Sequence, residues 1–321
     1  GRRTPSEAAR GERPHPLPMV PHLTTSLTGP LQDLERLVLD RRPEIERWFR
    51  SRFAEHEVPF YSSVDLRNSG FKLAPVDTNL FPGGFNNLNP DFLPLCVHAA
   101  MSAIQKLCPD AQKFVLVPEN HTRNLFYLQN VATLKRILEG AGLAVRVGSL
   151  IPDLAGPTEF ETAGGDRLLL EPLRRSGNRV GLEGFDPCAV IVNNDLSGGV
   201  PGILRDLEQT VVPPLIAGWS TRRKSQHFHA YETVAEDFAE LVGIDPWLVN
   251  PVFSQCSAVN FAEKEGEDCL AANVEYVLSE VREKYAQYGI TEAPFAIVKA
   301  DAGTYGMGIM TVKSADDVRN L

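Results

Sequence analysis

The chain has 321 residues, of which 43% are apolar and 23% are charged. This length suits about two domains of roughly 100–200 residues each, and the composition excludes a largely disordered protein. Lys and Arg number 32 against 41 acidic residues, and the net charge of −9 argues against broad electrostatic capture of nucleic acid or anionic lipid. No apolar run approaches the roughly 18 residues that a membrane helix needs.

The five cysteines are few, odd in number and never spaced C-x-x-C. Their spacing argues against a disulfide framework or a structural zinc site and indicates a reducing, cytoplasmic compartment. None lies in a nucleophile motif, so we expect all of them to be packing residues. They are Cys96, Cys108, Cys188, Cys256 and Cys269.

The two ends of the chain differ from the rest. Residues 1–18 hold four Arg and four Pro without apolar periodicity, so we expect a disordered tail. From Ser314 the sequence reads as a capping Ser, acids in a first turn and then an apolar residue, which is typical of a helix start. We expect that last helix to have nothing to pack against, and the chain to be a truncated product.

Between the ends, helical periodicity comes first, at residues 31–54, where Pro43 should interrupt the helix. Residues 58–88 instead contain strand-like segments at 63–66 and 71–73, separated by Asn, Gly and Pro. A second helix is expected over 90–107.

A strand–helix–strand pattern then predicts a parallel sheet covered by helices, and so an α/β fold. Its strands are expected at 113–117 and 144–147, on either side of a helix at 124–139. The remaining expected elements are strands at 168–170, 189–192, 295–299 and 309–312 and helices at 232–242 and 267–288.

The strongest chemical signal is a lysine at the end of a strand, followed by a glycine-rich loop. Lys299 ends the strand FAIVK, and Gly303, Gly306 and Gly308 follow in the loop before the next strand. Glycine lets successive backbone N–H groups point inward around an anion, and a lysine at the strand end can reach a phosphate oxygen. The pattern therefore favours phosphate binding; the alternative is a hairpin with a flexible turn and a lysine in solvent.

Together with two other stretches, this segment resembles the bacterial glutamate–cysteine ligase family, which is related to the ATP-grasp carboxylate–amine ligases. The motifs are SSVDLRNSGFKLAPVDTNLFPGGFNNL, GWSTRRKSQHF and VKADAGTYGMGI, and the resemblance covers about residues 20–321. It implies ATP- and Mg²⁺-dependent joining of the L-glutamate γ-carboxyl group to the L-cysteine amine through a γ-glutamyl phosphate, the first step of glutathione biosynthesis. Such ligases carry their magnesium-binding residues on a further lobe after the glycine loop, which we expect to be missing from this chain.

The resemblance also implies a division of the chain. We expect a segment with substrate loops over 19–110 and a Rossmann-like, pre-ATP-grasp-like parallel-sheet domain over 111–250. Residues 251–321 then form the first part of an ATP-grasp-like nucleotide lobe.

For the nucleotide, the resemblance implies contacts from Lys299 and from the glycine loop that follows it. The loop residues so assigned are Gly303, Thr304, Tyr305, Gly306 and Gly308.

For the amino acids, polar residues crowd into the segment after the first strand-like stretch. A zwitterion needs a cation for its carboxylate and an acid or amide for its ammonium group, and the planar fork of an arginine suits a carboxylate best. The expected substrate residues are Asp65, Arg67, Lys72, Asn79, Asn86 and Asn87. The alternative is an ordered loop in which Asn and Asp cap turns and Arg67 forms a structural ion pair.

Asn193 and Asn194 are further substrate candidates, because ligands gather at the carboxyl ends of parallel strands. The alternative is that they cap the next turn. In the GWSTRRKSQHF stretch we assign Arg222 and Lys224 as catalytic cations at an anion site, against the alternative of a solvated charged turn. His227 and His229 lack nearby acids or cysteines, so no metal site is assigned.

Two rival functions stay open at this stage. One is an ATP-grasp ligase for another carboxylate–amine pair, since a phosphate site does not identify the acceptor. The other is a non-catalytic fragment that binds a nucleotide or an amino acid.

Overall fold

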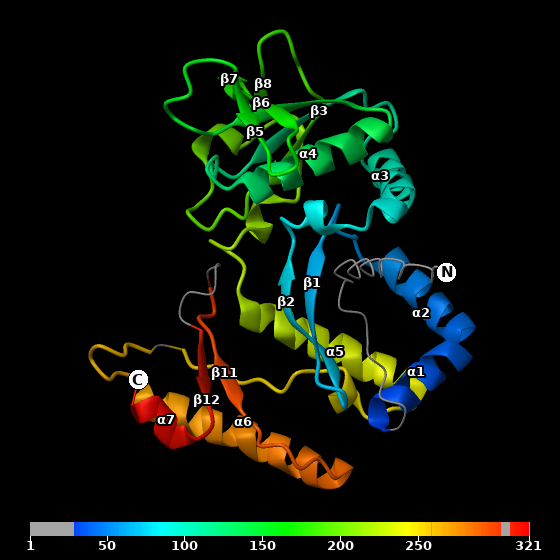
Figure 1. Ribbon diagram of the computed structural model, residues 1–321, viewed down its shortest axis with the longest axis vertical. Helices are drawn as coiled ribbons and strands as arrows, with labels where there is room; N and C mark the ends of the chain where they lie inside the picture. Colours follow the sequence, from blue (N-terminus) through cyan, green and yellow to red (C-terminus); the bar gives the residue numbers. More distant parts are fainter. Residues whose placement is uncertain (1–28, 258, 303–308, 321) are drawn as a thin grey trace, which may run out of the picture.

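The computed structural model describes residues 29–257, 259–302 and 309–320. The expected N-terminal tail and the glycine-loop residues Gly303, Thr304, Tyr305, Gly306 and Gly308 lie outside the described residues. Figure 1 shows a parallel-rich sheet with its helices at the top, a hairpin and helices below it, and a small α/β unit at the lower left.

The sheet at the top has six strands in the order β10-β9-β3-β4-β6-β5. All neighbours are parallel except β5, which runs antiparallel to β6. The strands are β3 (Lys113–Pro118), β4 (Ala144–Ser149), β5 (Thr158–Glu161), β6 (Arg167–Pro172), β9 (Ala189–Asn193) and β10 (Thr210–Val212). The α/β class is confirmed. The strands β5 and β10 and the small hairpin of β7 (Arg174–Ser176) and β8 (Arg179–Gly181) were not expected, because segments of three or four residues are too short to show a strand pattern.

The central strand β3 explains why this sheet forms the core. Residues 114–117 are fully buried, and alternate side chains point to opposite faces of the sheet. Phe114 and Leu116 pack with α4 (Leu125–Gly140) on one face, and Val115 and Val117 pack with a second apolar cluster on the other. A strand that is buried on both faces has a continuous apolar sequence, and the sequence KFVLV therefore predicted β3.

The N-terminal part contains two helices with a break close to Pro43, as expected. Helix α1 (Pro30–Asp40) ends at the residue before Arg41, and α2 (Arg42–Glu55) restarts with Pro43 in its first turn, where a missing N–H costs nothing. Two short 3-10 turns, η1 (Phe85–Asn87) and η2 (Pro90–Phe92), precede α3 (Leu93–Leu107).

Helix α5 (Lys224–Val242) lies in the lower part of the molecule, away from the sheet (Figure 1). It packs against α2, where Arg52 bonds Asp237 at 2.5 Å and the rings of Trp48 and Phe238 are 5.8 Å apart. It begins eight residues before the expected Glu232, because the polar first turns carry no apolar period but are capped at Arg223 by the Gln226 side chain.

The hairpin of β1 (Ser63–Asn68) and β2 (Leu73–Asn79) stands between the sheet and α5 (Figure 1). Gly70 at its tip has φ 88°, a conformation that glycine adopts without strain, and its N–H bonds the Asn68 side chain. β1 is longer than the expected 63–66. The second strand was misplaced: it was expected at 71–73, but it begins at Leu73 and continues to Asn79 through a segment of mixed polar residues.

The C-terminal unit contains α6 (Glu267–Tyr288), β11 (Ala296–Val298), β12 (Met310–Val312) and α7 (Ala315–Arg319), with β11 and β12 antiparallel. The bounds of α6 match the expected helix. The expectation that the last helix has nothing to pack against is wrong, because Val318 of α7 is 1% exposed and joins the apolar cluster of α6 and the two strands.

Two cysteines also differ from the expected packing role. The sulfur atoms of Cys256 and Cys269 are 3.0 Å apart, and Cys269 is exposed. The side-chain amide of Asn273 donates to Cys256 at 2.8 Å. These residues form a polar thiol pair at the start of α6.

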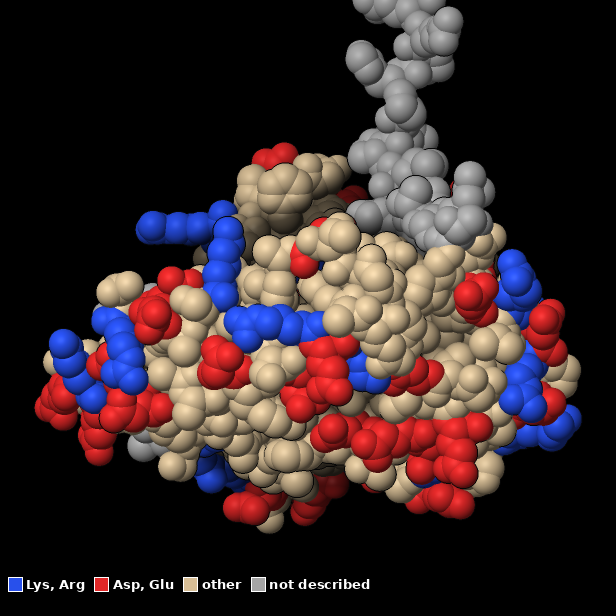
Figure 2. All heavy atoms as spheres, turned by 90° about the horizontal axis from the view of Figure 1, so that it is seen from below, with Lys and Arg blue, Asp and Glu red and all other residues tan. Residues whose placement is uncertain are grey.

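None of the described helices is both long enough and apolar enough to cross a membrane. On the face seen from below, acidic and basic side chains are intermixed (Figure 2), so that face presents no broad basic surface. This agrees with the acidic net charge of −9.

Candidate active site

Lys299, the residue after β11, lies against the middle of the hairpin. Its Nζ atom donates to the carbonyl of Val76 at 3.1 Å. Burial lowers the pKa of Lys299, and the nearby charge of Lys224 lowers it further. Among the described residues Lys299 forms no ion pair within 4.0 Å, so it is a partly buried cation without a carboxylate partner.

The hairpin has an irregularity where Lys299 meets it. Asp65 on β1 lies opposite Asp77 on β2, but the next residue, Leu66, lies opposite Pro75. Val76 is therefore the extra residue of a β-bulge, a feature that is frequent beside active sites because it redirects a strand locally. The carbonyl of this extra residue is the one that receives Lys299.

Arg222 reaches the same strand from the loop before α5. Its guanidinium donates to the Thr78 carbonyl at 3.1 Å and to the Thr78 hydroxyl at 2.7 Å. Burial lowers the pKa of Arg222, and the charge of Asp77 opposes this effect. Arg222 also stands over the ring of Trp219, with 4.8 Å from its Cζ atom to the ring centre.

Lys224 joins these cations from the first turn of α5. Its Nζ atom is 5.6 Å from the centre of the Trp219 ring. Its backbone N–H donates to the carbonyl of Asp301 at 2.9 Å, and the Asp301 carboxylate accepts from the N–H and the hydroxyl of Ser225, each at 2.8 Å. The N-terminus of α5 is thus tied to the segment that follows β11, with an acid where the helix dipole favours one.

Four cations therefore gather from three distant parts of the sequence. Arg67 completes the set: its charge lowers the pKa of Lys299, and Asp65 and Asp77 act in the opposite direction. Arg67 forms no hydrogen bond or ion pair among the described residues, which removes the structural ion pair as an explanation of this side chain. We call Arg67, Arg222, Lys224 and Lys299 the cationic cluster. Arg67 is exposed and the other three are partly buried; such cations bind carboxylate and phosphoryl oxygens.

Lys72 lies elsewhere, at the tip of the hairpin. It stands over the ring of Trp247, 4.4 Å from the ring centre, and burial lowers its pKa to about 8. Five residue-to-residue steps of about 3.3 Å along the strand, roughly 16 Å in all, separate Lys72 from Asp77. The structure thus makes Lys72 part of an aromatic contact between the hairpin and Trp247 in the segment after α5, and does not bring it to the cationic cluster.

The amides after β2 take local roles. The Asn79 side chain accepts from the N–H of Phe81 at 2.8 Å, as in the capping alternative. Asn86 and Asn87 lie in η1, which is held to the sheet domain by the bond from the N–H of Phe85 to Asn130 at 2.9 Å. The structure does not bring Asn86 or Asn87 to the cationic cluster by any contact of the described residues.

Asn193 is the centre of a buried polar network at the end of β9. It is 2% exposed; its amide nitrogen donates to Pro82 at 2.7 Å, and its amide oxygen accepts from Tyr127 at 3.1 Å and Asn130 at 3.2 Å. Tyr61 adds a bond to the carbonyl of Val192 at 2.5 Å. Since these partners use its hydrogen-bonding capacity, Asn193 fixes the base of the hairpin on the sheet rather than pointing to a ligand.

Asn194 behaves as the capping alternative describes. Its side-chain oxygen accepts from the N–H of Leu196 at 3.0 Å. The next residue, Asp195, accepts the backbone N–H of Trp219 at 2.9 Å, and this bond connects the sheet to the loop that carries Arg222.

Glu119 is a residue that the sequence analysis missed. It follows β3 where the neighbours β4 and β9 leave in opposite directions, the position at which parallel sheets place ligands. Burial raises its pKa to about 7, while the N–H of Asp195, donating at 2.7 Å, lowers it. The sequence signal that could have identified Glu119 is its position directly after the strand Lys113–Pro118.

His227 packs among aromatic rings near Arg222 and Asp77. Burial lowers its pKa, and its Nε2 atom is buried without a hydrogen-bond partner among the described residues. No group of three or more His, Cys, Asp or Glu side chains in the described part of the chain is placed to hold a metal ion.

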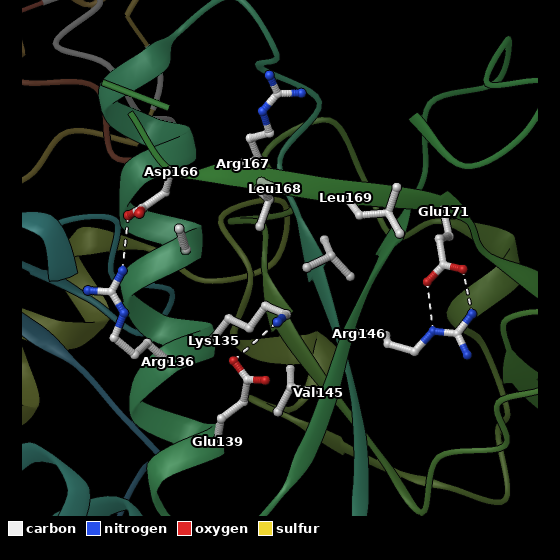
Figure 3. Close-up of a pocket in the computed structure, with 12 residues that line it drawn as sticks. Lys135, Arg136, Glu139, Val145, Arg146, Asp166, Arg167, Leu168, Leu169 and Glu171 are labelled. Atoms are coloured by element: carbon white, nitrogen blue, oxygen red, sulfur yellow. Dashed lines mark hydrogen bonds and ion pairs between the residues drawn. The ribbon is translucent and has the colours of Figure 1, made fainter. Parts of the chain in front are cut away.

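A separate cavity of about 500 Å³ lies on the sheet domain beside α4 (Figure 3). Six of its charged side chains pair with each other: Lys135 with Glu139, Arg136 with Asp166 and Arg146 with Glu171. The seventh, Arg167, pairs with Glu159 outside the lining. Because the charged side chains of this cavity already have ion-pair partners, they offer little to a charged ligand. The cationic cluster is therefore the better candidate site.

Known proteins resemble this chain over most of its length. The model of the family "GshA: Glutamate-cysteine ligase" matches residues 35–321. A crystal structure from Methylobacillus flagellatus KT, of a protein described as a gamma-glutamylcysteine synthetase, is 63% identical with a TM-score of 0.89. It covers 94% of this chain and 72% of its own chain. No curated protein matches the chain. The family match over most of the sequence and this identity show that the chain belongs to the glutamate–cysteine ligase family.

Proposed function

We propose that this glutamate–cysteine ligase uses the cationic cluster to hold ATP phosphates while the γ-carboxyl group of L-glutamate is phosphorylated and then joined to the amine of L-cysteine. The observation that carries the proposal is the meeting of Lys299, Arg222 and Lys224 at the bulge of β2, with Lys299 and Arg222 bonded to the carbonyls on either side of Asp77.

The chemistry requires activation, because a carboxylate is a poor electrophile. A γ-carboxylate oxygen forms a bond to the terminal phosphorus of ATP, and the bond from that phosphorus to ADP breaks. The cysteine nitrogen then attacks the acyl carbon, the C–O bond to phosphate breaks, and the nitrogen loses a proton. Both steps spread negative charge over phosphoryl oxygens, which preorganised cations stabilise.

The residues present fit this task. Burial lowers the pKa values of Lys299 and Arg222 because it disfavours their charged forms. A bound anion would stabilise the charged form of each. A divalent metal carried with the nucleotide would neutralise charge on the same oxygens. The backbone N–H of Lys224 bonds to Asp301, which precedes in sequence the glycine loop that we assigned to the phosphates.

We also propose that residues 251–321 are part of an ATP-grasp-like nucleotide lobe. The antiparallel pair β11 and β12, which flanks the glycine loop and packs on α6, supports this proposal. The division at 110 and 250 stays a proposal as well, with α5 packed on α2 rather than on the sheet. A reaction that consumes ATP and two amino acids suits the cytoplasm.

The test is ADP release with each amino acid omitted in turn. We expect release only when both L-glutamate and L-cysteine are present. Release that needs neither, or that prefers another acid and amine, would remove the substrate assignment; tight nucleotide binding without release would favour a non-catalytic binding protein.

The Lys299→Met variant tests the site. Loss of one charge-assisted contact to phosphate should raise the KM for ATP or lower kcat by about 10–100-fold. Lys135→Met is the matched control, because Lys135 pairs with Glu139 on α4 in the separate cavity. Unchanged ATP kinetics in Lys299→Met would exclude this lysine from the site.

A further inference from the structure

We propose that Asp77 is the residue that selects an α-ammonium group on the carboxyl-donating substrate, which makes the site specific for an amino acid over a plain dicarboxylic acid. This inference rests on the proposed function and adds a specificity-determining residue to it.

The position of Asp77 is the first argument. It lies on β2 between Val76 and Thr78, whose carbonyls receive Lys299 at 3.1 Å and Arg222 at 3.1 Å. The two cations therefore bracket Asp77 but bond to its neighbours. Among the described residues the Asp77 carboxylate itself makes no hydrogen bond and no ion pair within 4.0 Å.

The second argument is the cost of leaving this carboxylate unpaired. Asp77 is partly buried, and a partly buried carboxylate is stabilised by donors that satisfy its oxygens. The charges that face it are Arg222, Lys299 and the carboxylate of Asp65, which lies opposite Asp77 on β1. His227 packs nearby with a buried Nε2 atom that has no partner among the described residues. An ammonium group brings three N–H donors to the place that these side chains leave unfilled.

The charges around Asp77 also suit the rest of an amino acid. The charges of Arg67 and Asp77 both act on Lys299, so the two side chains lie near the same amine. The guanidinium of Arg67 has no hydrogen-bond or ion-pair partner among the described residues. A zwitterion can therefore place its ammonium group at Asp77 and its α-carboxylate at the planar fork of Arg67. A doubly charged metal ion fits less well, because the cationic cluster surrounds the same carboxylate.

The chemistry decides which of the two amino acids binds there. The amine that attacks the acyl carbon must lose its proton, and a neighbouring carboxylate would keep it protonated. The α-ammonium group of the carboxyl donor takes no part in bond making and stays charged throughout. Asp77 therefore suits the donor, L-glutamate, and not the acceptor.

The experiment compares glutamate with glutarate, which has the same reacting carboxyl group but no ammonium group. The dissociation constants of both are measured with the wild-type enzyme and with Asp77→Asn. We expect glutamate binding to weaken by about 10–100-fold in the variant, the range for a hydrogen bond to a charged group, while glutarate binding changes by less than about threefold. Asp77→Glu keeps the charge, so it should retain most of the preference for glutamate.

Asp186→Asn is the matched control, since Asp186 forms only exposed bonds with Arg179 on the sheet domain. Thermal melting of each variant separates folding from binding. An unchanged ratio of the glutamate and glutarate dissociation constants in Asp77→Asn, which includes equal weakening of both, would overturn the proposal. Tighter ATP binding with that ratio unchanged would show instead that Asp77 only offsets the positive charge of the cationic cluster. If the wild-type enzyme binds no glutamate at all, the proposed function fails and not Asp77 alone.

Discussion

The indole ring of Trp219 lies beneath the guanidinium of Arg222, with 4.8 Å between the ring centre and Cζ, and the Lys224 amine is 5.6 Å from the same ring centre. Trp219 is 5% exposed, and its backbone N–H is fixed by the carbonyl of Asp195. One aromatic ring thus contacts two cations whose mutual repulsion would otherwise separate them.

Trp219→Leu should therefore disturb the cationic cluster without removing a charge. We expect the KM for ATP to rise by about 5–30-fold, the equivalent of one or two cation–π contacts, and Trp219→Phe to recover most of this loss because it keeps an aromatic face. Steady-state kinetics check the result, with Trp48→Leu as control, since Trp48 makes the same kind of contact with Arg52 on α2. Equal effects of Leu and Phe at residue 219 would contradict a role of the ring in positioning the cations.

Gly218→Ala should destabilise the protein by about 1–3 kcal/mol, because the added methyl group would lie 2.7 Å from Cβ of Leu196 and 3.1 Å from the Asp195 carbonyl. Urea unfolding measures the change. Gly198→Ala serves as control, since nothing lies within 4 Å of the position its methyl group would take. Similar stabilities of the two variants would show that the loop accommodates the methyl group.

Asn193→Ala should cost about 2–4 kcal/mol, since it leaves buried partners such as Asn130 and the Pro82 carbonyl unsatisfied. Asn194→Ala, which removes only the bond to the N–H of Leu196, should cost about 1 kcal/mol. Denaturant unfolding of both variants checks this order, and a smaller loss for Asn193 would contradict its central role in the network.

Glu119→Gln should change how stability depends on pH. The Glu119 pKa rises from 4.5 to about 7 on folding, so between these values the folded state binds more protons than the unfolded state. Wild-type stability therefore falls as pH rises from about 4.5 to about 7, and this cost is fully present above pH 7. Because Gln does not titrate, the variant should gain on the order of 2 kcal/mol relative to the wild type across this range. A stability difference that is independent of pH would contradict the shift.

Cys256 and Cys269 should form a disulfide when the protein is treated with a thiol oxidant, because their sulfurs are already 3.0 Å apart. The two thiols would lose two protons and pass two electrons to the oxidant as the S–S bond forms. Peptide mass mapping should find this pair crosslinked before any pair that includes Cys96, Cys108 or Cys188, and Cys269→Ser should abolish the crosslink. Crosslinks of Cys256 to another cysteine would contradict the observed pairing.

Much of the fold follows from local sequence. The apolar run at β3, the Asn cap of α4 and the stripe and terminal glycine of α6 each act within one element, so their bounds agree closely with expectation. The short strands β5 and β10 have no such signal, because their partners in the sheet and not their own residues stabilise them. The start of α5 was missed for a related reason: its polar first turns are held by Asp301, which is 76 residues away in sequence from Ser225.

The sequence by itself determined the α/β class, the family and the presence of cations in three separate motifs, because these depend on residue type, period and spacing. Only the tertiary structure decided that Lys299 and Arg222 meet at the bulge of β2 whereas Lys72 lies at the far end of the same hairpin. The physical reason is that the charge environment of a side chain depends on which distant segments pack beside it. The bulge at Val76 and the bonds of Arg222 and Lys299 to β2 arise only once the whole chain has folded.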